Sequence, residues 1–323
     1  MAVLTPHEAF GDLVTTTFRH QSTKIADAIS KHNAVFRKLE PKKVRVSGGT
    51  TICHPLDYQE NSTYQRYSGY DTLNMNASPH LTNAEFNWRS VAVSVVASGQ
   101  ELRINNSKEQ IINLVKSRTK NAQRTFANNF SMDMMSDGTL PNQINGIRAL
   151  ISDSGLGTVG NINAANWEFW RNKVQTANAS LHGINYTLSK DNIDQVMLEL
   201  YMACTRGDDA PDLILADTIL YAMFENSQLP LRRYTSKEAT GQSGFTALKY
   251  KGADVLWDTV NMPSNRMYFL NTEYLDLVVH PDADMTPLPN VRPHNQDASV
   301  TSMIWMGNMV CSNRMLQGVL KPS

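Results

Sequence analysis

Residues 155–160 are the part of this sequence whose types and spacing most resemble a chemical site. They read GLGTVG, which matches the G-x-G-x-x-G pattern of loops that bind dinucleotides. In such loops the third glycine packs within a helix whose N-terminus faces the pyrophosphate. Here residues 161–163 continue the loop. The sequence also lacks the acidic residue that the motif places about 20 positions further on, at the end of a second clear strand. We therefore predict no cofactor, and keep a nucleotide-binding enzyme using this loop only as an alternative.

The other reactive residues lack the spacing that catalysis requires. Cys53 and His54 are adjacent, and neighbours in an extended strand point to opposite faces, so the thiol and the imidazole do not meet. The 8 histidines are scattered, without the H-x-x-x-H or H-E-x-x-H spacing of metal sites. Neither a G-x-S-x-G motif nor a P-loop is present. The sequence predicts neither a metal site nor an enzyme.

Composition indicates a globular protein kept in a reducing compartment. The chain has 323 residues, and 41% of them are hydrophobic, which suffices for a substantial core. Its 3 cysteines have no C-x-x-C spacing, so neither a disulfide framework nor a zinc knuckle is indicated. The first ten residues do not resemble a signal peptide, and no stretch approaches the about 20 apolar residues of a membrane span. We expect a protein made in a cytoplasm, with no membrane partner.

Opposite charges gather in different parts of the chain, although 30 basic and 30 acidic residues cancel. Zero net charge argues against a dedicated nucleic-acid-binding protein, whose affinity comes from neutralised phosphates. Residues 19–45 hold eight Lys or Arg and two acids, whereas residues 191–217 are rich in aspartate. Such a distribution either steers one copy of the chain toward another or belongs to two charged faces that are simply exposed to solvent.

Residues 47–83 form a long segment that is too poor in aliphatic residues to fold alone. The segment contains no Val, Phe, Trp or Lys, and its composition lacks the high net charge that favours disorder. It carries tyrosines, which are enriched where two proteins meet because they combine a large rigid ring with a polar tip. We predict that it lies on another subunit, with these inter-subunit contact candidates: Tyr58, Tyr64, Arg66, Tyr67 and Tyr70.

A long helix is predicted from Ser107 to about residue 136. Apolar residues recur on one of its faces at helical spacing, namely Ile111, Val115, Ala122, Phe126 and Phe130. Its other face is basic. Three residues on this face follow one another at intervals of four, about one helical turn: Lys116, Lys120 and Arg124. These three are our candidates for weak, non-specific contact with DNA on an inner surface, although most such faces are merely solvated.

Shorter elements are predicted on both sides of this helix. We expect helices over residues 5–19, 24–39, 164–177 and 190–205, and a long alternating strand from residue 83 onward. Residues 146–151 read as a short strand, and residues 211–216 as a buried strand running into a helix. Three strands over residues 253–257, 267–270 and 274–279 are predicted to form a β-meander. A last strand pair is expected within residues 300–320, with a bend at Gly307 and Asn308.

In this order the features resemble the major capsid proteins of tailed bacteriophages with the Hong Kong 97 fold. Short motifs support the resemblance along the chain: INGI at residues 144–147, YKGADV at 250–255 with Asp258 and Pro263, YFLNT at 268–272, and MGNMVCSNR at 306–314. None of these motifs is catalytic, so the resemblance depends on their order and combination.

The resemblance implies an α+β Hong Kong 97-like capsid fold with five parts. These are an N-terminal arm (residues 1–46), an extended β-hairpin loop (47–83), a peripheral domain with a long spine helix (84–141), a mixed axial domain (142–280) and a return to the peripheral domain (281–323). It also implies a structural protein of the virion that assembles into pentamers and hexamers of an icosahedral shell around double-stranded DNA. An encapsulin-like protein compartment is the alternative within the same fold.

Two departures from the family pattern lead to further expectations. The founding member cross-links a lysine of its extended loop to an asparagine of a neighbour, but residues 47–83 contain no lysine, so we expect a non-covalent shell, secured where necessary by a cement protein. Only about 45 residues precede the loop, fewer than a small independent domain has. We therefore expect a separate scaffolding protein, together with a portal, as partners during assembly in the host cytoplasm.

Overall fold

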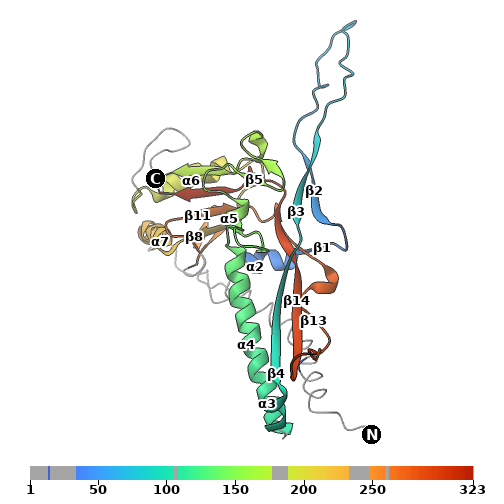
Figure 1. Ribbon diagram of the computed structural model, residues 1–323. Coiled ribbons are helices and arrows are strands. Elements are labelled where there is room, and N and C mark those ends of the chain that lie inside the picture. Colours follow the sequence, from blue (N-terminus) through green and yellow to red (C-terminus); the bar gives the residue numbers. More distant parts are fainter. Residues whose placement is uncertain are drawn as a thin grey trace.

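The computed structural model describes Val14 and residues 34–104, 108–176, 188–232, 248–258 and 262–322. Figure 1 shows a body of mixed helices and strands, a long arm formed by a helix beside two strands, and a hairpin that projects the opposite way. Of the helix predicted over residues 5–19, the structure describes Val14 alone. Of the helix predicted over 24–39, the structure describes α2 (Ala34–Leu39), which a 3-10 turn (Glu40–Lys42) ends at Pro41.

A five-stranded sheet forms the arm and its junction with the body. Its strand order is β1 (Val44–Arg45), β12 (Leu275–Val279), β14 (Ala298–Cys311) and β13 (Thr286–Pro287), and β4 (Arg89–Ser98) also pairs with β14. The β4–β14 pair is antiparallel and runs from Ser98↔Ala298 to Arg89↔Gly307. This confirms the long strand predicted after residue 83, which the structure divides into β3 (Leu81–Asn87) and β4.

The long helix α4 (Lys108–Met134) packs along this sheet through an aromatic cluster. Phe126 stacks on Phe130 with ring centroids 5.5 Å apart, and Phe130 meets the edge of Trp305 of β14 at 4.8 Å. Val115 and Ala122 are buried on the same face. The helical period therefore predicted both the helix and the face that it buries.

A capping box fixes the end of β4 and the start of the short helix α3 (Gly99–Ile104). The amide of Glu101 donates to the Ser98 hydroxyl at 3.2 Å, and the amide of Ser98 donates to the Glu101 carboxylate at 3.1 Å. Arg118 of α4 donates to the other carboxylate oxygen at 2.6 Å. The backbone hydrogen bond from Ser98, followed by the bond from Arg118, lowers the pKa of Glu101. The contact joins both helices to β4.

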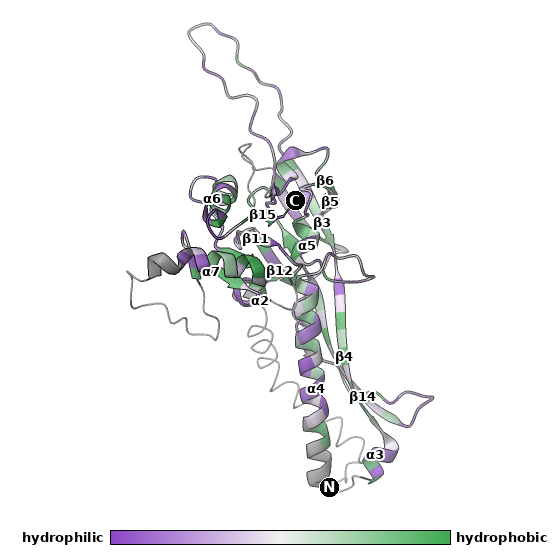
Figure 2. Ribbon diagram, turned by 90° about the vertical axis from the view of Figure 1, so that its left-hand side faces the viewer, coloured by the Kyte–Doolittle hydropathy of each residue, from purple (hydrophilic) through white to green (hydrophobic). Residues whose placement is uncertain are grey.

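A six-stranded sheet forms the body. Its order is β7 (Lys173–Thr176), β15 (Gly318–Lys321), β11 (Met267–Leu270), β8 (Leu213–Ala216), β10 (Ala253–Trp257) and β9 (Leu248–Tyr250). Two helices, α6 (Ile193–Ala203) and α7 (Thr218–Arg232), pack on one face through residues such as Val196 and Phe224. Figure 2 shows strongly hydrophobic residues on both helices, as well as elsewhere in the body. The helix predicted over 190–205 and the strand predicted over 211–216 are confirmed.

The predicted β-meander is wrong, because the three strands do not pair with one another. Strand β8 is buried along its whole length and takes β10 as a parallel partner on one side and β11 as an antiparallel partner on the other. The third strand, β12, lies in the five-stranded sheet. The chain therefore passes between the two sheets after β11 and again between β14 and β15.

Three local predictions are also wrong. Residues 146–151 form a helical turn, α5 (Ile147–Leu150), rather than a strand. Residues 164–177 form a 3-10 turn (Glu168–Trp170) followed by β7, because β7 pairs with β15 and Arg171 holds the carbonyl oxygens of Ala164 and Ala165 at 2.7 and 2.8 Å. The last strand pair predicted within residues 300–320 is wrong, because β14 continues through Gly307 and Asn308 and β15 lies in the other sheet. A Cβ at Gly307 would lie 2.3 Å from the carbonyl oxygen of Val278, so this glycine permits close packing rather than a bend.

The three thiols differ in burial, which leads to a testable prediction. Cys204 and Cys311 are buried, and burial raises the pKa of each thiol to about 12, whereas Cys53 is exposed on β2 (Thr51–Asp57). Because the thiolate is the reactive form, we expect iodoacetamide at pH 8 to alkylate Cys53 alone in the native protein and all three cysteines in urea. Mass spectrometry of intact protein counts the adducts. Two or more adducts on native protein would contradict the described packing.

Candidate inter-subunit surface

The projecting hairpin has an ordered root and an irregular tip. We define the root as the antiparallel ribbon of β2 and β3, which pair from Thr51↔Asn87 to Asp57↔Leu81, and the tip as residues 58–80. Alternate residues of the root face the body, and four of them are buried in the main core: Ile52, Leu56, Ala84 and Phe86. The root is therefore fixed to its own chain, whereas the tip projects beyond it (Figure 1).

The tip is held by its own polar contacts and leaves its apolar side chains uncovered. Gln65 donates to the carbonyl oxygen of Thr72 at 3.0 Å, and the Asp71 carboxylate accepts from the amide of Ser68 at 2.8 Å. Tyr64 is 81% exposed and Tyr70 is fully exposed. Other exposed side chains of the tip are Arg66, Tyr67, Leu73 and Met75. This grouping of large exposed side chains is typical of a surface that another protein covers.

Tyr58 differs from the other tyrosine candidates because it already packs within its own chain. Its ring stacks on Phe169 at 5.3 Å and meets the edge of Trp167 at 5.6 Å. The structure thus brings Tyr64, Arg66, Tyr67 and Tyr70 together on the tip and places Tyr58 at its junction with the root. Contact of any of these five residues with a second copy stays a prediction.

The glycine loop forms a β-hairpin that supports the root. Strands β5 (Thr158–Val159) and β6 (Ile162–Asn163) are joined by Gly160 and Asn161, whose φ angles of 59° and 63° match the type I′ turn of tight hairpins. The carbonyl oxygen of Gly160 accepts from the amide of Glu85 of β3 at 3.0 Å. No helix begins at the third glycine, so the loop lacks the helix N-terminus that a pyrophosphate requires.

Substitution of Gly160 by valine should detach this support from the root. A side chain at φ 59° is strained, and its Cβ would lie 3.0 Å from both Ala84 and Phe86. We expect a loss of about 2–4 kcal/mol of unfolding free energy and faster hydrogen exchange at the amide of Glu85. Gly157→Ala is the control, since Gly157 also has a positive φ but no atom within 4 Å. Equal effects of the two substitutions would contradict the packing argument.

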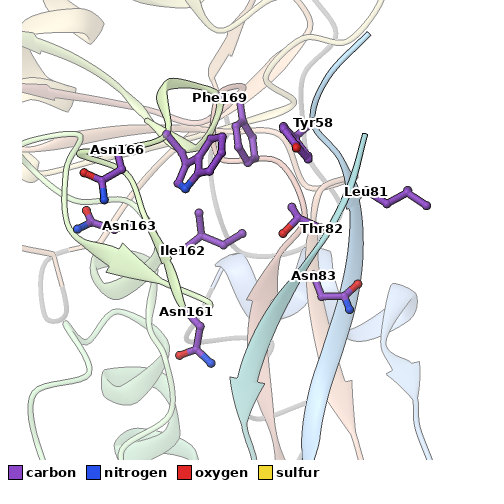
Figure 3. A pocket seen from close by; sticks show the side chains of 10 residues that line it. Tyr58, Leu81, Thr82, Asn83, Asn161, Ile162, Asn163, Asn166 and Phe169 are labelled. Carbon is purple, nitrogen blue, oxygen red and sulfur yellow. The ribbon is translucent and has the colours of Figure 1, made fainter. Parts of the chain in front are cut away.

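A cavity of about 410 Å³ opens between the root and the β5–β6 hairpin (Figure 3). We call it the Trp167 pocket, and ten residues line it: Tyr58, Leu81, Thr82, Asn83, Asn161, Ile162, Asn163, Asn166, Trp167 and Phe169. None of these ten residues is charged. The sequence analysis missed the pocket, because three segments distant in the chain build it and Trp167 stood in a wrongly predicted helix.

The basic residues of α4 are only partly gathered on one exposed face. Lys120 and Arg124 are exposed and lie one turn apart, whereas the side chain of Lys116 is outside the described residues. Arg118 turns instead toward Glu101 and also donates to the carbonyl oxygen of Val96. Contact of Lys116, Lys120 and Arg124 with DNA remains a prediction.

Several basic residues of the segment 19–45 pair with acids of their own chain. The Nζ atom of Lys38 lies 3.1 Å from the Asp254 carboxylate, and that of Lys43 lies 2.6 Å from Asp284. Arg45 also reaches Asp284, at 3.8 Å. These pairs tie the segment before the hairpin to both sheets, so the local excess of positive charge is smaller than the sequence suggests.

The described part of the chain shows neither a cluster of metal ligands nor a membrane-spanning helix. No group of three or more potential ligands from His, Cys, Asp and Glu is placed to hold a metal ion. None of the described helices is both long and apolar enough to cross a membrane.

Comparisons with solved structures identify the fold. The chain superposes on a capsid protein of cyanophage A-1(L) with a TM-score of 0.61 at 14% identity, covering 88% of this chain and 90% of the other. It superposes on the capsid protein of a native GTA particle with a TM-score of 0.57 at 15% identity, covering 93% and 90%. An encapsulin from Synechococcus elongatus gives 0.52 at 10% identity, covering 86% and 83%.

The sequence itself gives no such match, since no family model and no curated protein matches it. The structural likenesses establish an α+β fold that this chain shares with these solved shell proteins. More particularly, it is the Hong Kong 97-like capsid fold that the sequence resemblance implied, with its projecting hairpin and long spine helix.

Proposed function

We propose that this chain is the major capsid protein of a tailed bacteriophage. It assembles into pentamers and hexamers of an icosahedral shell that encloses double-stranded DNA, and its role is structural rather than enzymatic. The observation that carries the proposal is the hairpin tip, whose large side chains are exposed at the end of a root fixed to the body. Burying these side chains requires a second copy, and a capsid fold supplies copies at a regular spacing.

The proposed parts and partners follow the family pattern. Residues 1–46 are the N-terminal arm, 47–83 the extended loop, 84–141 and 281–323 the peripheral domain, and 142–280 the axial domain around the symmetry axis. A scaffolding protein, a portal and, where needed, a cement protein take part in assembly in the host cytoplasm, before the chain becomes part of the virion. The exposed Lys120 and Arg124 support weak contact with packaged DNA.

The content of purified particles distinguishes a phage capsid from a protein compartment. The likeness to an encapsulin favours the compartment as the second candidate. Particles isolated from infected or lysogenic cells should contain nuclease-protected DNA of genome length. Particles that hold a cargo enzyme and no protected DNA would instead support the encapsulin-like alternative.

The shell should be held together without covalent links between subunits. The extended loop contains no lysine that could form an amide bond with a neighbour. Boiled and reduced particles should therefore give one capsid band near 36.1 kDa on a denaturing gel. A ladder of multiples of this mass would contradict the prediction.

A further inference from the structure

The Trp167 pocket has the features of an acceptor for a large uncharged side chain. Trp167 is 48% exposed, although the rings of Tyr58 and Phe169 pack against it at 5.6 and 6.0 Å. Figure 3 shows Ile162, Thr82 and the aromatic rings bordering the cavity between the two chain segments. A volume of about 410 Å³ lies within the ~300–1,000 Å³ range of pockets that hold small ligands.

The lining chemistry excludes charged occupants and favours an amphipathic one. The ten lining residues include no acid and no base, so nothing in the pocket would neutralise a phosphate or a metal ion. An indole face provides apolar contact, and the hydroxyl of Thr82, which Figure 3 shows on the side of the strand that faces Ile162, provides a donor and an acceptor. A phenol matches this combination, because its ring is apolar and its hydroxyl both donates and accepts.

The hairpin tip of the same chain presents side chains of this kind. Tyr64, Tyr67 and Tyr70 are exposed. Tyr58, at the base of the tip, lines the pocket, but beyond it the tip projects away from the body of its own chain (Figure 1). The 12 steps along the chain from Tyr58 to Tyr70 span at most ~40 Å at about 3.3 Å per step. Because the root holds the base of the tip on the body, the tip extends beyond its own chain, where a second copy can meet it (Figure 1).

We propose that the Trp167 pocket accepts a tyrosine side chain from the hairpin tip of a second copy of this chain. The inference rests on the proposed function as a shell subunit and names the acceptor of its loop. A contact from the tip of one copy to the root of the next is heterologous, and repeated rotation closes such contacts into a ring. Trp167 is then an interfacial anchor, a role in which tryptophan is enriched.

Disulfide trapping tests the contact directly. In a Cys53→Ser background, which removes the exposed thiol, one preparation carries Asn166→Cys and the other carries a tip substitution: Tyr64→Cys, Tyr67→Cys, Tyr70→Cys or Met75→Cys. The two preparations are mixed, assembled and oxidised. We expect a disulfide-linked dimer from at least one tip position, and only in the assembled fraction. Particles that form from the mixtures without a linked dimer at any tip position would overturn the proposal.

A pair of tryptophan substitutions measures the strength of the contact. Trp167→Ala should raise the protein concentration needed for assembly more than tenfold, whereas Trp257→Ala, at a 41% exposed tryptophan outside the pocket, should change it less than threefold. An equal response of the two variants would count against the pocket.

If the parent chain forms no rings or particles under any assembly condition, the proposed function itself fails. This outcome differs from particles that form but lack the cross-link, which would overturn only the pocket contact.

Discussion

Replacement of Arg314 by methionine should destabilise the folded subunit by about 3–5 kcal/mol, a large share of the stability of an ordinary domain. Arg314 is fully buried and donates to the carbonyl oxygens of Leu150 and Trp170 at 2.7 and 2.9 Å and to the Asn172 side chain at 2.9 Å. Methionine fills a similar volume but removes the donor of the Leu150 and Trp170 carbonyl oxygens, and leaves the Asn172 oxygen only the bonds from Ser152. The segment of Leu150 and the segment of Trp170 and Asn172 would lose their shared contact with Arg314.

Chemical denaturation of the subunit measures this effect, with Arg292→Met as the control. Arg292 is exposed, so its substitution should change the unfolding free energy by less than about 0.5 kcal/mol. Burial lowers the pKa of Arg314 to about 10, which leaves it charged at neutral pH. The pKa of Arg314 is lower in the folded than in the unfolded protein, so the free energy of unfolding should rise with pH only above about pH 10. At pH 7 Arg314 is charged in both states, so its titration does not contribute to the measured difference. A loss below 1 kcal/mol would contradict the role of Arg314.

Deletion of residues 62–74 should abolish shell formation while leaving the subunit folded. The deletion removes most of the exposed tip, including Tyr64 and Tyr70, and spares the root and its core residues. We expect the melting temperature of the dissociated subunit to change by less than about 3 °C, because the deleted side chains make few contacts with the body. Assembly should fall below detection in sedimentation, because each copy loses its reach to a neighbour.

A matched control keeps the tip but changes its composition. Replacing residues 62–74 by a Gly/Ser segment of equal length preserves the chain length and removes the tyrosines. It should fail to assemble as the deletion does. Normal shells from either variant would show that the tip makes no necessary contact, and a collapse of the melting temperature would show that it stabilises its own subunit.

The elements that were predicted correctly are those whose pattern lies within one segment. The helical spacing of Val115, Ala122, Phe126 and Phe130 predicted α4 and its buried face, and the alternation around Val91, Val93 and Val95 predicted β4. The poverty of residues 47–83 in aliphatic side chains predicted a protrusion. Each of these signals comes from residues that are close in sequence.

The features that were missed depend on partners far away in the chain. Strand β10 pairs with β8 rather than with β11, and no local pattern states which neighbour a buried strand will take. Residues 164–177 contain two tryptophans at helical spacing, but pairing of β7 with β15 outweighs the local propensity. The Trp167 pocket and the packing of Tyr58 likewise depend on contacts between the root and residues 161–169.

Electron microscopy of the purified full-length chain tests the central claim most directly. The protein should be examined at increasing concentration, alone and with any scaffolding protein encoded beside it. The proposed function predicts closed particles of uniform diameter, with pentameric and hexameric capsomers in a reconstruction and the hairpin tip of each copy over its neighbour. A protein that stays monomeric or forms only small oligomers under all of these conditions would contradict it.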